Sequence, residues 1–317
     1  MARPCDAPFF IVFYGFSLRL LVNNRRMSIS AWVLEKVLKI RGASRPTTPK
    51  RFYKELRKNA IIYKRGEGRK ACCLGVQVEE GVYCGMRYLV FIPKQVDATT
   101  SVLYLHGSGY MHPHQAVHER FAATIAKNTH LRVYFPLYPK LPVCTAVSSF
   151  AVLNNFCTFL LKKGGVIPVG DSSGASICLA LASGRLELTT VVAISPWLDL
   201  RMGDEEEEMR SSDKMLCPNT LRYIARLWAY DLPYEDVRLS PIFGSFVDKR
   251  IWVFVGSKEI LYPAACRFRD HSQGAELTCI VGEGMQHDYP LTPTPEGRAA
   301  RLRICDIISE AVYKRGK

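Results

Sequence analysis

The most restrictive feature of the sequence is the pentapeptide GDSSG at residues 170–174. It follows the short apolar run 166–169 and precedes the apolar run 173–182, which suits a helix. A G-x-S-x-G pattern between a strand and a helix is typical of a sharp turn that presents the central serine above the edge of a sheet, while the glycines let strand and helix approach closely. The sequence therefore predicts Ser172 as an exposed nucleophile at the apex of this turn.

From residue 72 onward the sequence alternates between short apolar runs, typical of buried strands, and longer segments with helical spacing. The predicted strands are 74–78, 88–92, 102–105, 132–137, 166–169, 190–194, 251–255 and 276–281, the first two paired through a turn near Glu80-Gly81. The predicted helices are 116–127, 146–162, 173–182, 219–230, 264–272 and 296–313. Such alternation requires crossover connections, so we expect an α/β fold with a mostly parallel, eight-stranded sheet and helices on both faces.

A serine hydroxyl becomes a good nucleophile only when a neighbouring base accepts its proton. Two of the seven histidines, His271 and His287, follow Ser172 in the sequence. His271 falls within the predicted helix 264–272, whereas His287 falls in a loop after the last predicted strand, where a base can meet the serine. We therefore predict His287 as the base.

The base needs a carboxylate that fixes its tautomer and stabilises its cation. Glu259 is the only acidic residue between the predicted strand 251–255 and the helix that follows it. Its place after the penultimate strand gives the chain order Ser172, Glu259, His287. Serine, acid and histidine are known to occur in this order in proteins whose serine lies on a strand–turn–helix of this kind. We predict Glu259 as the orienting acid.

A glycine-containing loop, residues 106–110 (HGSGY), follows the predicted strand 102–105. Attack of a serine on an acyl group creates a negative oxygen, which backbone N–H groups must stabilise. Glycines allow the main chain to approach that oxygen closely. The loop is therefore the predicted source of these donors.

Taken together, these segments resemble the hormone-sensitive-lipase-like esterase family of α/β-hydrolases, which includes arylacetamide deacetylases and many microbial esterases. The resemblance runs from about residue 72 to the end of the chain. Residues 106–110 are similar to the family's H-G-G-G block with its following aromatic residue, 138–142 to Y-R-L-A-P-E, 170–174 to G-D-S-A-G, 195–200 to S-P-W-x-D-L, 240–241 to its later S-P, and 284–287 to G-M-x-H.

The resemblance implies specific oxyanion donors, namely the main-chain N–H groups of Ser108, Gly109 and Ser173. Ser108 stands where the family has a glycine, and Glu259 stands where aspartate is more usual. The resemblance also implies a helical cap built from the N-terminus and from an insertion. We expect cap helices in residues 28–71, a cap insertion at about 201–238 and a catalytic domain over 72–317. The acidic run 204–208 in that insertion is expected to be a solvated loop.

The resemblance further implies a serine hydrolase that cleaves carboxylic esters of small to medium acyl chain through an acyl-enzyme, with no metal and no cofactor. Tyr110, Met111 and Trp197 adjoin the matched blocks and are predicted to line an apolar pocket for a small-molecule ester. Two alternatives remain open at this point. The same residues could serve an amidase or deacetylase, or the fold could be a non-catalytic ligand-binding protein.

The positive charge of the chain is concentrated at its N-terminus. Residues 1–71 carry +13 of the formal net charge of +14, so the rest of the chain is nearly neutral. A nucleic-acid-binding protein would be expected to place its charge on a recognisable module, which the sequence lacks, and we predict no nucleic-acid partner. A basic segment that contains Trp32, Phe52 and Tyr53 fits either a solvated face or peripheral contact of residues 1–71 with an anionic membrane. The oligomeric state is left open.

We expect residues 1–27 to form an N-terminal extension or anchor that precedes the cap helices. Residues 8–18 are strongly apolar and are followed by Asn23-Asn24-Arg25-Arg26. Three interpretations stay open: a cleaved signal peptide, a membrane-associated anchor, or an upstream extension before a start at Met27.

Eleven cysteines are present, none in a C-x-x-C pattern, and several lie inside apolar runs. This usage indicates buried free thiols that act as small hydrophobic residues. We therefore expect a cytoplasmic protein, with membrane association through the N-terminus as an open addition.

Overall fold

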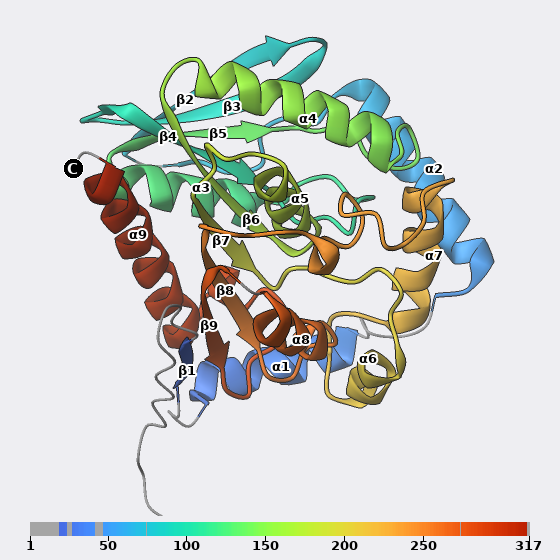
Figure 1. Ribbon diagram of the computed structural model, residues 1–317. Helices are drawn as coiled ribbons and strands as arrows, with labels where there is room; N and C mark the ends of the chain where they lie inside the picture. The colour runs from blue at the N-terminus through green and yellow to red at the C-terminus, as the bar shows by residue number, and fades with distance from the viewer. Residues whose placement is uncertain (1–18, 24–26, 42–46, 74, 273, 316–317) are drawn as a thin grey trace, which may run out of the picture.

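The computed structural model describes residues 19–23, 27–41, 47–73, 75–272 and 274–315, which form one sheet with helices on both faces (Figure 1). The strands are β1 (Arg19–Asn23), β2 (Val76–Tyr83), β3 (Met86–Pro93), β4 (Asp97–Leu105), β5 (Leu131–Pro136), β6 (Gly165–Asp171), β7 (Thr190–Ile194), β8 (Arg250–Gly256) and β9 (Glu276–Gly282). The helices are α1 (Ile29–Arg41), α2 (Pro49–Arg65), α3 (Ala116–Thr129), α4 (Ala146–Leu161), α5 (Ser172–Ser183), α6 (Asp204–Glu208), α7 (Pro218–Ala229), α8 (Tyr262–His271) and α9 (Pro295–Arg315).

The strands of the described residues lie in the order β1-β9-β8-β7-β6-β4-β5-β3-β2. Neighbouring strands from β5 through β4 to β9 are parallel, whereas β3 runs antiparallel to both β5 and β2. The predicted α/β fold with a mostly parallel sheet is therefore confirmed. Strands β2–β9 are the eight predicted ones, and β1 adds one more beside β9.

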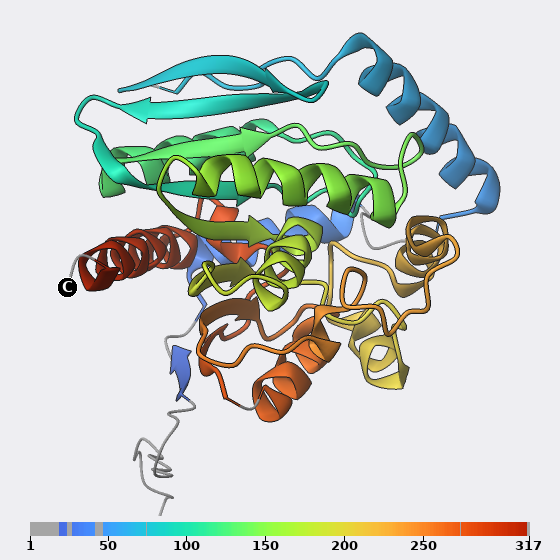
Figure 2. The same ribbon diagram turned by 45° about the horizontal axis from the view of Figure 1, so that its top comes forward.

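Two buried apolar layers hold the helices against the sheet. On one face α3 and α9 pack through residues such as Phe121 and Ile304. On the other face α4, α5 and α8 pack through residues such as Phe156, Leu179 and Phe268. Figure 2 shows the sheet between these two groups of helices. The carboxyl ends of the parallel strands are left for the loops that carry the candidate site.

The turn between β2 and β3 differs from the predicted one. Glu80-Gly81 lies inside the hairpin, where Gly81 is paired with Tyr88. The chain reverses at Cys84 and Gly85, which have φ of 47° and 80°. A two-residue turn between twisted strands requires positive φ at both residues. The sequence Cys84-Gly85 is only a weak signal for such a turn, because cysteine is uncommon at positive φ.

The acidic run 204–208 was predicted wrongly as a solvated loop. It forms the short helix α6, in which Glu206 is buried. Glu206 Oε1 accepts a hydrogen bond of 2.6 Å from Arg267 on α8, so a partner more than 60 residues away removes this carboxylate from solvent.

The apolar run 8–18 and the pair Arg25-Arg26 lie outside the described residues, so the three interpretations of residues 1–26 stay predictions. Within the described part of the chain, no helix has the length and apolar character needed to cross a bilayer. All ten cysteines in that part are free thiols. The buried ones are Cys73, Cys157, Cys178, Cys217, Cys279 and Cys305.

The turn between β6 and α5 is fixed by backbone contacts that exclude side chains. Gly174 lies against the end of β4, where an added Cβ would come within 2.1 Å of the Leu105 carbonyl oxygen. Because the obstacle is backbone in the middle of the sheet, it cannot move aside cheaply. Gly174 thus sets the distance between α5 and β4, and with it the height of Ser172 above the sheet.

We expect Gly174→Ala to lower the free energy of unfolding by about 3 kcal/mol, the upper part of the range for overpacking. Gly184→Ala is the matched control, because a Cβ at Gly184 meets nothing within 4 Å. Thermal melting of the two variants checks this. Equal melting temperatures would contradict the close approach of α5 and β4.

Candidate active site

Ser172 stands at the junction of β6 and α5 with a φ of 51°. A positive φ is strained for a residue with a side chain and persists only where the surroundings impose it. This conformation places Ser172 Oγ 3.0 Å from His287 Nε2. The predicted turn is therefore present, with the predicted serine at its apex.

His287 lies in the loop after β9, and its Nδ1 is 2.7 Å from Glu259 Oε2. Glu259 is buried in the loop after β8, and its other oxygen accepts a 3.0 Å hydrogen bond from Gly256 N–H. With both oxygens engaged, the carboxylate is held in one position. The structure thus brings Ser172, His287 and Glu259 into one chain of hydrogen bonds, although 115 sequence positions separate Ser172 from His287.

The loop of residues 106–110 lies against the same turn. Gly107 N–H donates to Asp171 Oδ2 at 2.7 Å, and Ser108 N–H donates to Ser173 Oγ at 3.1 Å. Among the described residues, the Gly109 N–H donates to no acceptor. Ser173 lies in the first turn of α5, where N–H groups have no acceptor within the helix. Two of the three predicted donors are therefore unengaged, and the third is held by the Ser173 hydroxyl.

A buried ionic network supports this loop from the side of the N-terminal helices. Glu67, just after α2, accepts from His114 Nδ1 at 2.7 Å and pairs with Lys140 Nζ at 2.8 Å. The opposite ring nitrogen of His114 is 2.9 Å from Glu119 Oε1. Burial opposes the charge on Glu67, but His114 and Lys140 outweigh it and lower the pKa of this carboxyl. The sequence analysis missed this network because its members are far apart in the chain.

A cavity of about 430 Å³ opens above Ser172 and His287. Its size lies within the range of small-molecule sites. Ser108 and Gly109 lie in its wall, so the candidate donors face the same space as the serine. The apolar part of the wall consists of Trp197, Met215, Leu216, Leu221, Ile224 and Leu261.

Of the three predicted pocket residues, only Trp197 lines this cavity. The prediction for Tyr110 and Met111 was wrong, because both are buried in the core behind it. The ring of Tyr110 stacks on Trp228 at 4.4 Å and on Trp197 at 5.6 Å between centroids. Tyr110 thus supports the pocket wall from behind.

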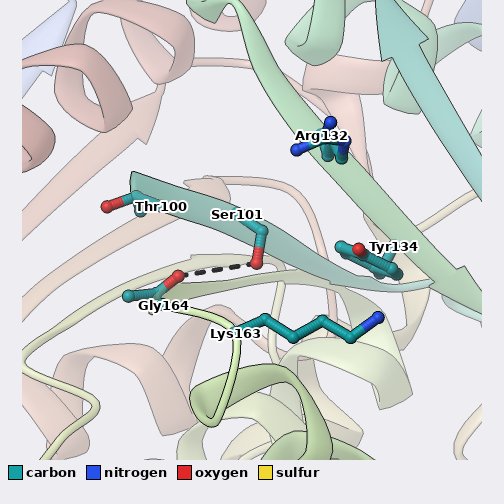
Figure 3. A pocket seen from close by; sticks show the side chains of 7 residues that line it. Thr100, Ser101, Arg132, Tyr134, Lys163 and Gly164 are labelled. Atoms are coloured by element: carbon teal, nitrogen blue, oxygen red, sulfur yellow. Dashed lines mark hydrogen bonds between the residues drawn. The ribbon is translucent and has the colours of Figure 1, made fainter. Parts of the chain in front are cut away.

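A second hollow, of about 310 Å³, lies at the amino ends of β4, β5 and β6, away from the candidate site (Figure 3). Its lining includes Ser101, Arg132, Tyr134 and Lys163. Ser101 Oγ donates to the Gly165 carbonyl at 3.5 Å, and none of the predicted site residues lines this hollow. The chemistry suggested by the sequence therefore belongs to the first cavity.

The sequence model of a protein family described as alpha/beta hydrolase fold matches residues 102–291. The matched span contains Ser172, Glu259 and His287. The chain belongs to this α/β-hydrolase family. The membership that the sequence motifs indicated is confirmed.

Several known proteins are similar to this α/β-hydrolase. An esterase of Acinetobacter venetianus is 28% identical over 198 residues, and a triacylglycerol lipase of Mycobacterium tuberculosis is 26% identical over 238 residues. The aligned regions cover 59% and 71% of this chain, but 65% and 49% of those relatives. The crystal structure of an esterase from the bacterial hormone-sensitive lipase family superposes with a TM-score of 0.76 at 20% identity, over 90% of this chain and 99% of that one.

A further carboxylate of this α/β-hydrolase, Asp288, was missed by the sequence analysis. Its Oδ2 lies 3.3 Å from His287 Nε2, on the same ring nitrogen that faces Ser172. An acidic neighbour of the histidine is visible in the sequence, but the direction of its side chain depends on a backbone φ of 53°. Two carboxylates therefore contact the imidazole, one at each nitrogen.

These carboxylates control the protonation of His287. Burial opposes the imidazolium, but the charges of Asp288 and Glu259 outweigh burial and raise the pKa of His287 to about 10. The raised pKa of His287 favours the protonated imidazole. It must lose this proton before it can accept the one on Ser172.

We expect the rate at which a fluorophosphonate probe labels Ser172 to rise with pH well above the ordinary histidine range. Asp288→Asn removes the carboxylate at Nε2, lowers the pKa of His287, and should move this rise about one pH unit or more towards acid. Labelling rates between pH 5 and 10 measure the shift. Asp306→Asn, on the exposed side of α9, is the control. Identical profiles for wild type and Asp288→Asn would show that Asp288 does not set this pKa.

Proposed function

We propose that this α/β-hydrolase cleaves carboxylic esters through an acyl-enzyme formed on Ser172. The observation that carries the proposal is the hydrogen-bonded chain from Ser172 through His287 to Glu259. A protein that only binds ligands has no need of a base beside the serine, so the complete chain supports catalysis over binding. Two relatives are named as an esterase and a triacylglycerol lipase, and both names refer to the cleavage of carboxylic esters.

In the proposed reaction, Ser172 Oγ attacks the ester carbonyl carbon while neutral His287 takes the hydroxyl proton at Nε2. The resulting imidazolium is stabilised by Glu259 at Nδ1. The tetrahedral intermediate collapses, the carbon–oxygen bond to the alcohol breaks, and His287 gives its proton to the departing oxygen. A water molecule then attacks the acyl-enzyme in the same way, with His287 taking its proton and returning it to Ser172 Oγ, and the carboxylic acid is released.

The negative oxygen of the intermediate would be stabilised by the N–H groups of Gly109 and Ser173. The first turn of α5 adds the positive end of the helix dipole at this point. The Ser108 N–H can join them once it exchanges the Ser173 hydroxyl for the substrate oxygen. Ser173 would therefore contribute to the reaction through its amide, while its hydroxyl holds the Ser108 N–H until substrate binds.

We infer that residues 28–71 and about 201–238 act together as the cap over this site. Phe52 of α2 stacks on Tyr223 of α7 at 5.5 Å between ring centroids, so the two segments meet. Met215 and Leu221 of the second segment lie in the cavity wall. A cap of this kind would exclude water from the acyl group, which strengthens the electrostatic interactions inside.

We propose that substrates have small to medium acyl chains. The cavity of about 430 Å³ is apolar on the side formed by Trp197, Leu221 and Ile224, which suits an aliphatic acyl group. Its volume lies in the lower half of the usual range for ligand sites. An acyl chain much longer than the cavity would leave apolar surface in water and gain little from binding.

We expect Ser172→Ala to abolish both ester hydrolysis and fluorophosphonate labelling, with a loss of at least about 10³-fold in kcat. The neighbouring variant Ser173→Ala is the matched comparison, because it keeps the proposed nucleophile and should still be labelled. Labelling on a gel and hydrolysis of p-nitrophenyl acetate measure both variants. Labelling that survives in Ser172→Ala and disappears in Ser173→Ala would reverse the assignment.

Among p-nitrophenyl esters from acetate to palmitate, we expect the highest kcat/KM at short to medium length, with a fall of roughly tenfold or more for the longest chains. The matching p-nitroanilides should be much poorer substrates. Ester and anilide rates measured side by side under one set of conditions provide the test. A preference for palmitate would refute the acyl-length proposal, and faster anilide cleavage would assign the site to amides.

A further inference from the structure

Helix α1 is apolar on both of its faces. Ala31, Leu34 and Leu38 lie on its inner face, against the protein. The opposite face carries large apolar side chains that are exposed to solvent. They are Ile29 (83% exposed), Trp32 (51%), Val33 (46%), Val37 (37%) and Ile40 (78%). We call these five residues the outer face of α1.

Such a row of exposed apolar side chains on one helix is unfavourable in water and marks a contact surface. A solvated helix of a globular protein normally has polar residues on its outer side. In α1 the polar contribution to that side comes from Lys36 and Lys39, both exposed. The outer face of α1 therefore combines apolar bulk with positive charge.

The outer face of α1 keeps its positive charge because the acidic residue of this helix is paired with a lysine on the protein side. Glu35, the one acidic residue of α1, accepts a 2.7 Å hydrogen bond from Lys258 of the catalytic domain. Lys36 Nζ lies 5.2 Å from the ring centroid of Trp32, so cation and aromatic ring are adjacent. The two residues that precede Met27 in the sequence are both arginines.

We propose that the outer face of α1 docks onto the surface of an anionic lipid bilayer. Helices that lie in such surfaces combine an apolar face with lysines, and tryptophan is favoured at the boundary between headgroups and acyl chains. The lysines complement the negative charge of the lipid. A second copy of this chain is a poorer occupant, because it would oppose Lys36 and Lys39 with the same positive charges.

The position of α1 gives this docking a consequence for the site. The inner face of α1 shares one small gap with Met215 and with Met285 and Gln286 of the loop that carries His287. Met215 also lines the cavity above Ser172. Docking through α1 would therefore hold the cavity close to the lipid, where apolar esters accumulate. Only this last step rests on the proposed ester hydrolysis.

The test uses the full chain with Ser172→Ala, so that binding is measured without any hydrolysis. We expect the protein to sediment with vesicles of 70% phosphatidylcholine and 30% phosphatidylserine, to bind pure phosphatidylcholine more weakly, and to be released by 1 M salt, where the screening length is about 3 Å. Ile29→Ser/Val33→Ser/Ile40→Ser should weaken binding at least tenfold. Lys36→Glu/Lys39→Glu should weaken it roughly tenfold or more.

The matched control is Val82→Ser/Leu186→Ser/Val247→Ser, which removes three exposed apolar side chains outside α1 and should bind like the parent. Unchanged melting temperatures and circular dichroism show that each variant is folded. No binding by the parent, or equal binding by the α1 variants, would overturn the proposal. A parent dimer that the triple α1 variant converts to monomer would assign the face to a second copy instead.

Discussion

The architecture of the candidate active site depends on one buried carboxyl side chain, Asp171, at the end of β6. Its Oδ1 accepts a 2.6 Å hydrogen bond from the Tyr104 hydroxyl, and its Oδ2 accepts from Gly107 N–H. A buried carboxyl group is tolerated only when its oxygens have hydrogen-bond partners. These partners therefore tie the loop after β4 to the turn that carries Ser172. Ser172 and the candidate oxyanion donors keep their relative positions because they share this anchor.

A second constraint acts on the imidazole of His287. Glu259 holds one ring nitrogen, and Asp288 contacts the nitrogen that faces Ser172. The pair stabilises the imidazolium that forms during the proposed reaction, but it also favours that cation at rest. Because the imidazolium is stabilised, His287 loses its proton less readily at neutral pH, and only the neutral imidazole can act as the base. We therefore expect the proposed reaction to be favoured as pH rises, with Asp288 among the groups responsible.

The N-terminal helices are joined to the site by ionic contacts as well as by apolar packing. Glu67 connects the end of α2 to the network beside the 106–110 loop, and Glu35 connects α1 to Lys258, next to Glu259 in sequence. Both of these acidic residues belong to the N-terminal segment 1–71, which is otherwise strongly basic. Among the described residues of this segment, the exposed Lys36 and Lys39 lie beside the outer face of α1. The segment thus has one side packed on the protein, and we propose that the other meets an anionic lipid surface.

Features that depend on local pattern could be predicted from the sequence alone: the alternation of strands and helices, the turn at Ser172, and the order of Ser172, Glu259 and His287. Hydrophobic period and glycine position report backbone conformation and burial along the chain. Three other features could be seen only in the folded chain: the burial of Tyr110 between two tryptophans, the approach of Asp288 to His287 Nε2, and the partner of Glu206. Those features depend on backbone angles at single positive-φ residues and on contacts between segments far apart in the chain. No local pattern specifies them, because the energies that select them exist only once the segments have packed.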